Sequence, residues 1–156
     1  DILYLHLALL AYRLDKQAKR GLSRRLKLKR EDTDDLLLVE ALRQKASRLN
    51  ETDQTSQVYE LLQPYPARVL ATVWTASAGD SVQERLLRYQ TEWRLVEPEI
   101  TGDDLKAMGL EPGPLFGELL NMLRDARLNG TVATRDQEVA LVEEELASRG
   151  HTKRET

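Results

Sequence analysis

Positively charged residues gather near the start of the chain, at spacings that suit phosphate binding. Arg and Lys side chains bind phosphate oxygens through charge-assisted hydrogen bonds, and residues three or four positions apart share one face of a helix. We predict contacts with an anionic partner for the seven cations between residues 13 and 27, which are Arg13, Lys16, Lys19, Arg20, Arg24, Arg25 and Lys27. The alternative is that they form an ordinary solvated helix face.

The distribution of charge favours an anionic partner for this segment in particular. The 156 residues carry a formal net charge of −3. Residues 1–30 contain nine Lys or Arg and two Asp, a balance of +7, whereas the remainder has a balance of −10. A basic region on an otherwise acidic protein is typical of a surface that attracts anions.

A second candidate site lies in the segment ITGDDLKAMGLEPGPLFGELL, residues 100–120, which contains four of the eight glycines and two of the five prolines. Gly113 precedes Pro114, and proline suits the first turn of a helix. The N–H groups at a helix start can bind a phosphate, although Pro114 itself lacks one. We predict that Lys106, Arg124 and Arg127 flank a phosphate bound at Gly113.

The same segment also has a purely structural interpretation. Thr101 can cap a short helix, and Gly109 suits the left-handed conformation that ends one. The prolines and glycines then form a sharp corner between two helices, and Gly117 lets another helix pack closely. A third interpretation is a helix-hairpin-helix that binds the backbone of duplex DNA.

The elements that position these residues are predicted to be helices. Apolar residues recur three or four positions apart, and no segment alternates with period two for long enough to indicate a strand. We expect an all-α fold of about eight or nine short helices in an irregular bundle, with a helix hairpin near residues 101–128. A helical region over residues 1–98 is followed by a hairpin region over residues 99–156. The expected helices cover about 2–14, 16–26, 30–49, 56–62, 66–77, 81–97, 103–108, 114–128 and 135–148.

The two N-terminal helices are expected to be buried in different ways. Ile2–Leu14 is too apolar to be exposed and is predicted to lie in the core. The following helix has Leu14, Ala18, Leu22 and Leu26 at i+4 spacing, which predicts its buried face. The apolar run is half the length that a membrane span requires.

No residue of the chain is predicted to be catalytic or to bind a metal. The chain has no Cys and two His, of which His6 is expected to be structural and His151 lies in a tail expected to be frayed. Acidic pairs such as Asp34-Asp35 and Asp103-Asp104 are expected to be solvated helix caps. Trp74 and Trp93 are expected in the core, with partial exposure and a base contact left open for Trp93.

Several segments together resemble a known family. The segments are ITGDDL at 100–105, GLEPGP at 109–114, Gly117-Glu118, DARLNGTV at 125–132 and TRDQE at 134–138. Upstream, SQVYELLQPYP, RLLRYQTEWRLVEPEITG and LSRRLKLKRED fit in the same order. The pattern resembles the C-terminal region of the bacterial tRNA nucleotidyltransferase (CCA-adding) and poly(A) polymerase family, and it covers most of the chain.

Three motifs of that family are absent or incomplete. The catalytic head of the family carries a Gly-Gly-x-x-Arg-Asp loop and a D-x-D pair of metal-binding aspartates, and neither occurs here in the required context. The nucleotide-selecting Glu-Asp-x-x-Arg motif begins at Glu31-Asp32, but Asp35 stands where the Arg should be. No catalytic residue is therefore carried over from the resemblance.

The resemblance implies a body-and-tail region that positions tRNA, recognised at its acceptor stem and elbow by shape and phosphate. The chain begins at Asp1, and we expect it to be a piece of a longer cytoplasmic protein whose head and neck would be further partners. That parent is expected to be a template-independent nucleotidyltransferase that uses Mg²⁺ and nucleoside triphosphates, whereas the piece itself needs no cofactor. The alternative function, from another class, is a helical scaffold or dimerisation module with no direct RNA contact. No membrane partner is expected.

Overall fold

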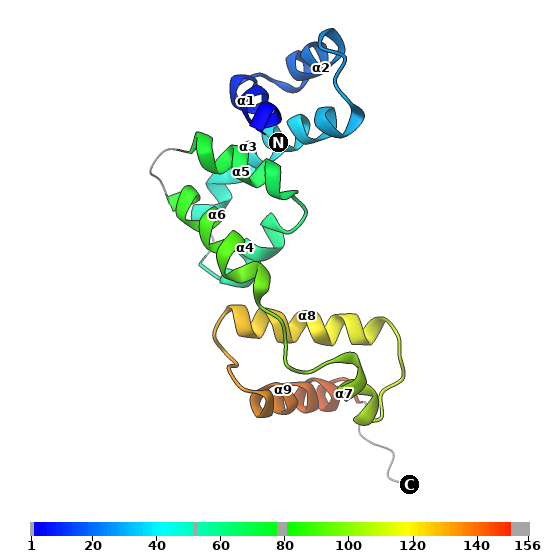
Figure 1. Ribbon diagram of the computed structural model, residues 1–156. Helices are drawn as coiled ribbons and strands as arrows, with labels where there is room; N and C mark the ends of the chain where they lie inside the picture. Colours follow the sequence, from blue (N-terminus) through cyan, green and yellow to red (C-terminus); the bar gives the residue numbers. More distant parts are fainter. Residues whose placement is uncertain (1, 52, 78–80, 151–156) are drawn as a thin grey trace. The chain divides into compact units, whose positions relative to one another are not determined.

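The computed structural model describes residues 2–51, 53–77 and 81–150, and Figure 1 shows that helices form nearly all of its regular structure. The predicted all-α fold is confirmed, since these residues contain helices and no strand. The helices are α1 (Ile2–Leu10), α2 (Lys16–Arg25), α3 (Arg30–Glu51), α4 (Thr55–Leu62), α5 (Ala67–Ala76), α6 (Ser81–Thr91), the 3₁₀ helix η1 (Trp93–Leu95), α7 (Gly102–Ala107), α8 (Pro114–Leu128) and α9 (Arg135–Ser148). Within the described ranges, none of these helices is both long and apolar enough to cross a bilayer.

The chain divides into two compact units, Asp1–Arg94 and Leu95–Thr156. The boundary was predicted after Pro98, and in the structure it lies after Arg94. The long helix expected up to residue 97 ends at Thr91, and η1 follows it.

In the first unit, α3 contacts α1, α2, α5 and α6, and α4 packs on α6. The apolar residues Leu36, Val39 and Leu42 follow one another at three-residue spacing along α3, and all three are fully buried. Val69 and Val73, four positions apart on α5, are also fully buried. Burial of each such side chain stabilises the fold by roughly 1.5–3 kcal/mol, so this face of α3 fixes the positions of the helices around it.

Helix α1 is only half buried, which corrects the prediction of a core helix. It ends at Leu10, and residues 11–13 form a turn. Tyr4, Ala8 and Ala11 lie on one face and are buried. Ile2 and Leu10, by contrast, are 75% and 84% exposed. The segment is apolar around its whole circumference, but only one face meets α3 and α5.

In the second unit, α8 packs against both α7 and α9. The core of this unit contains Leu105 from α7, Leu119 and Leu123 from α8, and Val142 from α9. Leu119 and Leu123 are four positions apart and so lie on one face of α8, which explains why one helix can contact both of the others.

The ends of the helices in the second unit agree with the capping predictions. The Thr101 hydroxyl accepts a hydrogen bond from the Asp104 N–H, and the Asp104 carboxylate accepts one from the Thr101 N–H, which is a capping box. Thr134 and Gln137 form the same arrangement at the start of α9. Gly109 has φ 88° and follows the last turn of α7, as predicted.

Neither Gly113 nor Gly117 has a left-handed backbone, and the structure contradicts the predicted role of Gly117. Gly113 has φ −179°, an extended conformation that any residue can adopt. Gly117 is exposed, and a Cβ added there would meet no atom within 4 Å. The expectation that Gly117 lets another helix pack closely is therefore wrong.

Candidate nucleic-acid interface

Helix α2 presents most of the predicted phosphate-binding residues. Asp15 precedes the helix, and its carboxylate accepts a hydrogen bond of 2.8 Å from the Ala18 N–H. Arg24 and Arg25 stand in the last turn, where positive charge complements the negative end of the helix dipole. The short, polar, well-capped helix thus holds its cations in fixed positions beside α3.

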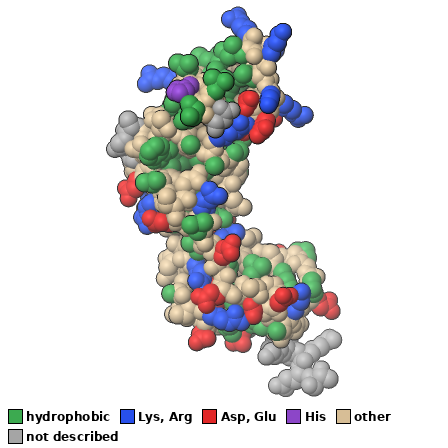
Figure 2. All heavy atoms as spheres, viewed as in Figure 1, with side chains coloured by type: hydrophobic (Ala, Val, Ile, Leu, Met, Phe, Trp, Pro, Cys, Tyr) green, Lys and Arg blue, Asp and Glu red, His purple; other side chains and the backbone are tan. Residues whose placement is uncertain are grey.

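Six of the seven predicted cations are exposed, and they carry unneutralised charge. Figure 2 shows Lys and Arg side chains projecting from the surface around α2, at the top of the view. None of the six forms an ion pair with the residues that the structure describes. They are Arg13, Lys16, Arg20, Arg24, Arg25 and Lys27. Cations of the second unit differ, because Lys106, Arg127, Arg135 and Arg149 are all paired with carboxylates.

Lys19 is the exception, and its prediction as a phosphate contact is wrong for this structure. Its side chain is fully buried, and its amine has no hydrogen-bond partner among the described residues. Burial lowers the pKa of Lys19, because removal from water disfavours the charged form. The nearby charges of Glu40 and Asp15 oppose that shift, whereas Arg43 adds to it. Lys19 therefore faces α3 and not the solvent.

The burial of Lys19 follows from how α2 is rotated. The predicted apolar face was Leu14, Ala18, Leu22 and Leu26, but Ala18 is exposed and Leu26 is 52% exposed. Lys19 and Ser23 are buried in their place. A stripe at i+4 spacing advances about 40° around a helix at each step, so it cannot stay on one face for three steps.

An open hollow of about 540 Å³ lies beside the exposed face of α2. We call it the α2 pocket. Its lining includes three of the exposed cations and the hydroxyl-bearing residues Ser23 and Thr33. The lining residues are Arg20, Ser23, Arg24, Lys27, Leu28 and Thr33.

The second predicted site, around Gly113, is not assembled. Arg124 and Arg127 lie 11 and 14 residues along α8 from Gly113, which at 1.5 Å per residue is about 16 and 21 Å. Lys106 is paired with Asp103 at 2.7 Å. The N–H of Phe116 is also occupied, since it donates to the Gly113 carbonyl at 3.0 Å. These residues cannot surround one phosphate, and the prediction is wrong.

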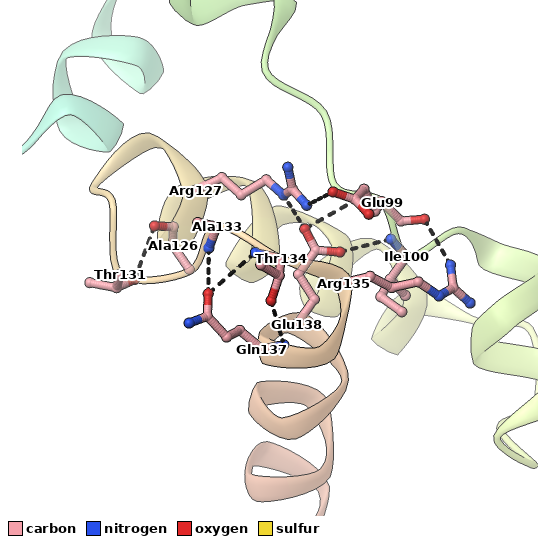
Figure 3. Close-up of polar contacts among 10 residues, drawn as sticks. All are labelled: Glu99, Ile100, Ala126, Arg127, Thr131, Ala133, Thr134, Arg135, Gln137 and Glu138. Carbon is pink, nitrogen blue, oxygen red and sulfur yellow. Dashed lines mark hydrogen bonds and ion pairs between the residues drawn. The ribbon is translucent and has the colours of Figure 1, made fainter.

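Arg127 instead belongs to an ion cluster that joins α8, α9 and the segment before α7 (Figure 3). The fully buried Glu138 carboxylate accepts hydrogen bonds from the Ile100 N–H at 2.8 Å and the Glu99 N–H at 3.2 Å. Arg127 donates to the same carboxylate and to Glu99, at 2.6 Å. Its pKa is raised by these bonds to Glu99 and Glu138. This cluster holds the second unit together, and sequence reasoning did not assign Glu138 any role.

Arg68 of α5 plays a comparable part in the first unit. It contacts Asp32 at 2.9 Å and Glu31 at 3.2 Å, and it donates to Asp35. Its guanidinium carbon lies 4.5 Å from the centre of the Tyr4 ring. Burial alone would lower the pKa of Arg68, but the hydrogen bonds that it donates to Asp35 and Asp32 raise it overall. The acidic residues at the start of α3 thus bind Arg68 and hold α5 against α3. No signal in the sequence identified Arg68 as the partner of these carboxylates.

Other candidate residues also differ from expectation. Asp35 is 5% exposed, so the Asp34-Asp35 pair is not simply a solvated cap. His6 is exposed on α1, and His151 lies outside the described residues. Trp93 is 8% exposed and has Arg88 against its ring, whereas Trp74 is 39% exposed. The prediction of partial exposure therefore fits Trp74 and not Trp93.

The described residues do not fit a magnesium site. Among them, no group of three or more His, Cys, Asp or Glu side chains lies close enough together to hold a metal ion.

Two curated proteins are similar in sequence to this chain. The A-adding tRNA nucleotidyltransferase of Geobacter sulfurreducens is 36% identical over 104 residues, which cover 67% of this chain and 12% of that protein. The A-adding tRNA nucleotidyltransferase of Halalkalibacterium halodurans is 30% identical over 71 residues, which cover 46% of this chain and 17% of that protein. No family model and no solved structure matches the chain. The similarity is thus to a small part of much longer proteins, and the predicted resemblance to the tRNA nucleotidyltransferase family is confirmed.

Proposed function

We propose that this chain is a tRNA-binding part, from the C-terminal region, of a cytoplasmic tRNA nucleotidyltransferase, and that α2 contacts the phosphate backbone of the tRNA. The observation that carries the proposal is the set of six exposed cations around α2 that no described carboxylate neutralises. Its curated relatives are A-adding tRNA nucleotidyltransferases, which makes tRNA the polyanion that this surface would meet.

The chemistry of the surface suits double-stranded RNA. Duplex RNA is recognised by shape and by contacts to phosphate and 2′-OH groups, because side chains cannot read its deep, narrow major groove. Lys and Arg on a helix face supply such contacts and position the partner without reading bases. Binding would therefore depend on the shape of the acceptor stem and elbow.

We propose that the catalytic step is carried out by other parts of a longer parent protein. We propose that those parts correspond to a head and a neck, use Mg²⁺ and nucleoside triphosphates, and add nucleotides to a tRNA that α2 helps to hold. The contribution of this chain would be to lower the dissociation constant of tRNA and to orient it.

A second function, as a scaffold or dimerisation module, is favoured by α1. Ile2, Leu3 and Leu10 are 75%, 78% and 84% exposed, and exposed apolar residues close together on one helix are typical of a protein contact surface. This function predicts a concentration-dependent molecular mass and no salt-dependent binding of RNA. Sedimentation equilibrium of the chain measures the first property directly.

A salt series tests the tRNA proposal. The dissociation constant of the chain is measured for a tRNA transcript, with duplex DNA of equal charge beside it. The logarithm of the association constant should fall with the logarithm of the salt concentration, with a slope of about −0.7 to −0.9 for each neutralised phosphate. Six contacts would give a slope of roughly −4 to −5.

A pair of matched double variants assigns the slope to α2. Lys16→Gln with Arg25→Gln removes two exposed α2 cations, and the slope should become shallower by about 2. Lys45→Gln with Arg94→Gln changes the net charge equally at exposed positions outside α2 and should leave the slope nearly unchanged. Equal effects of the two pairs would contradict the proposal, and duplex DNA binding as tight as tRNA binding would favour the helix-hairpin-helix interpretation.

A further inference from the structure

The α2 pocket combines features that a generally basic surface does not need. Arg20, Ser23 and Arg24 stand at positions i, i+3 and i+4 of α2, and Lys27, just beyond the end of the helix, lines the same pocket. The structure places no acidic side chain on the lining of the pocket. Three positive charges therefore converge on a hollow in which no described carboxylate balances them.

Ser23 provides an independent indication of a ligand. The residue is 5% exposed, and its hydroxyl has no hydrogen-bond partner among the described residues. Buried hydroxyl groups nearly always have a partner, because leaving one without a hydrogen bond is costly. This hydroxyl belongs to a residue that lines the pocket, so a group bound there could accept its hydrogen bond.

Lys27 stands where other helices of this protein have glycine. The Leu28 N–H donates to the Ser23 carbonyl at 3.0 Å and the Lys27 N–H to the Arg24 carbonyl at 3.3 Å, which is a Schellman ending. It requires the left-handed conformation, and Lys27 has φ 51°. Helices α7, α8 and α9 have Gly109, Gly130 and Gly150 with positive φ just beyond their last residues.

A lysine at this position is unfavourable for the backbone. The left-handed conformation brings a Cβ too close to the following carbonyl oxygen, so glycine would be the more stable residue. The side chain of Lys27 lines the pocket and places a positive charge there, which glycine could not do. A functional role for that charge accounts for a residue that the fold itself does not favour.

We propose that the α2 pocket seats one phosphodiester group of the RNA backbone, whose oxygens are bound by Arg20, Arg24, Lys27 and the Ser23 hydroxyl. The inference rests on the proposed function, since it names the point of α2 at which a phosphate of the tRNA is held. The phosphate would be bound at a defined position by specific side chains, and not only attracted by the overall positive charge of α2. The other exposed cations around α2, such as Lys16 and Arg25, contact neighbouring phosphates outside this pocket.

Opposite changes in stability and affinity test the role of Lys27. Lys27→Gly should raise the midpoint of thermal unfolding by roughly 4 °C, because glycine relieves the left-handed conformation. The same variant should bind tRNA more weakly near 0.1 M salt, by up to about eightfold, and its slope should be shallower by up to about 0.9, since one of the three cations around the seated phosphate is lost. Lys27→Arg keeps the charge and should retain most of the affinity.

Ser23→Ala separates a seated phosphate from diffuse charge. The variant removes no charge, so the salt slope should not change, but the affinity for tRNA should fall roughly fivefold through loss of one hydrogen bond. Thr75→Ala removes an exposed hydroxyl on α5 and serves as the control, with no expected loss.

The outcomes distinguish this inference from the function on which it rests. If wild-type chain does not bind tRNA, both the proposed function and the subsite fail. If wild-type chain binds tRNA and both Ser23→Ala and Lys27→Gly bind equally well, α2 is a diffuse basic surface and the subsite is overturned. Weaker binding by both variants, with Lys27→Gly more stable than wild type, is the result that supports it.

Discussion

Replacement of Glu138 by Gln should destabilise the second unit strongly while leaving the first unit intact. The Glu138 side chain is fully buried and accepts hydrogen bonds from two backbone N–H groups and from Arg127. Gln has the same shape but offers one acceptor oxygen and places an NH₂ group where the other oxygen stood. At least one of the three donors then faces another donor.

The expected loss can be worked out from these contacts. A hydrogen bond to a charged group contributes about 1.5–3 kcal/mol, and a buried donor left unpaired costs about 1–3 kcal/mol. Arg127 keeps its bond of 2.6 Å to Glu99 and is 18% exposed, which moderates the loss on that side. We expect the free energy of unfolding of the second unit to fall by roughly 2–4 kcal/mol.

The distribution of aromatic residues provides the assay. Both Trp and all five Tyr lie before residue 95, so the second unit contains neither type. Intrinsic fluorescence therefore reports on the first unit, whereas far-ultraviolet circular dichroism reports on the helices of both. In Glu138→Gln, part of the dichroism signal should be lost roughly 15–30 °C earlier than in wild type, because the second unit is small, with the fluorescence transition unmoved.

Glu144→Gln is the matched control, since Glu144 is exposed on the same helix and carries the same charge. It should change the stability by less than about 0.5 kcal/mol. A loss of similar size in the two variants would refute the assignment of Glu138 as the centre of the second unit. A shift of the fluorescence transition by the same amount as the dichroism transition would refute the independence of the two units.

Three further predictions follow from single positions. Lys19→Met should raise the free energy of unfolding by about 1–3 kcal/mol, because it removes a buried amine that has no hydrogen-bond partner among the described residues. Urea denaturation measures this change, and the affinity for tRNA should stay the same. Gly109→Ala should cost about 1–2 kcal/mol because φ is 88°, whereas Gly117→Ala, on an exposed helical face, should stabilise by about 0.5–1 kcal/mol in the same assay. Hydrogen bonds from Arg135 and Thr101 lower the pKa of Asp104, so the unfolded chain takes up a proton at this position before the folded one does. The stability of wild type should thus fall as the pH drops below about 4, and Asp104→Asn should show a weaker fall in an acid titration followed by circular dichroism.

The helices were predictable because their signals are local. Apolar spacing and the caps at Thr101 and Thr134 act within one or two turns, and Gly109 ends its helix through its own backbone conformation. Helix rise alone could also have excluded Arg124 and Arg127 as neighbours of Gly113, since the residues are separated by three to four turns of α8. That error was one of geometry and not of missing information.

The long-range pairs could not be read from the sequence. Arg68 and Asp35 are 33 positions apart, and Arg127 and Glu138 are 11 positions apart. Among 23 cations and 26 anions, no local pattern identifies which two will meet. The burial of Lys19 was missed for a related reason, since it depends on how α2 packs against α3 and not on the pattern within α2 itself.

The most direct test of the central claim is to map where tRNA contacts the chain. Backbone amide chemical shifts of the labelled chain are followed during titration with a tRNA transcript, and the perturbed residues are located on the sequence. The account predicts changes concentrated in residues 13–28, with the largest around Ser23 and Lys27. Changes concentrated in residues 100–118, or none at tRNA concentrations that saturate binding, would contradict it.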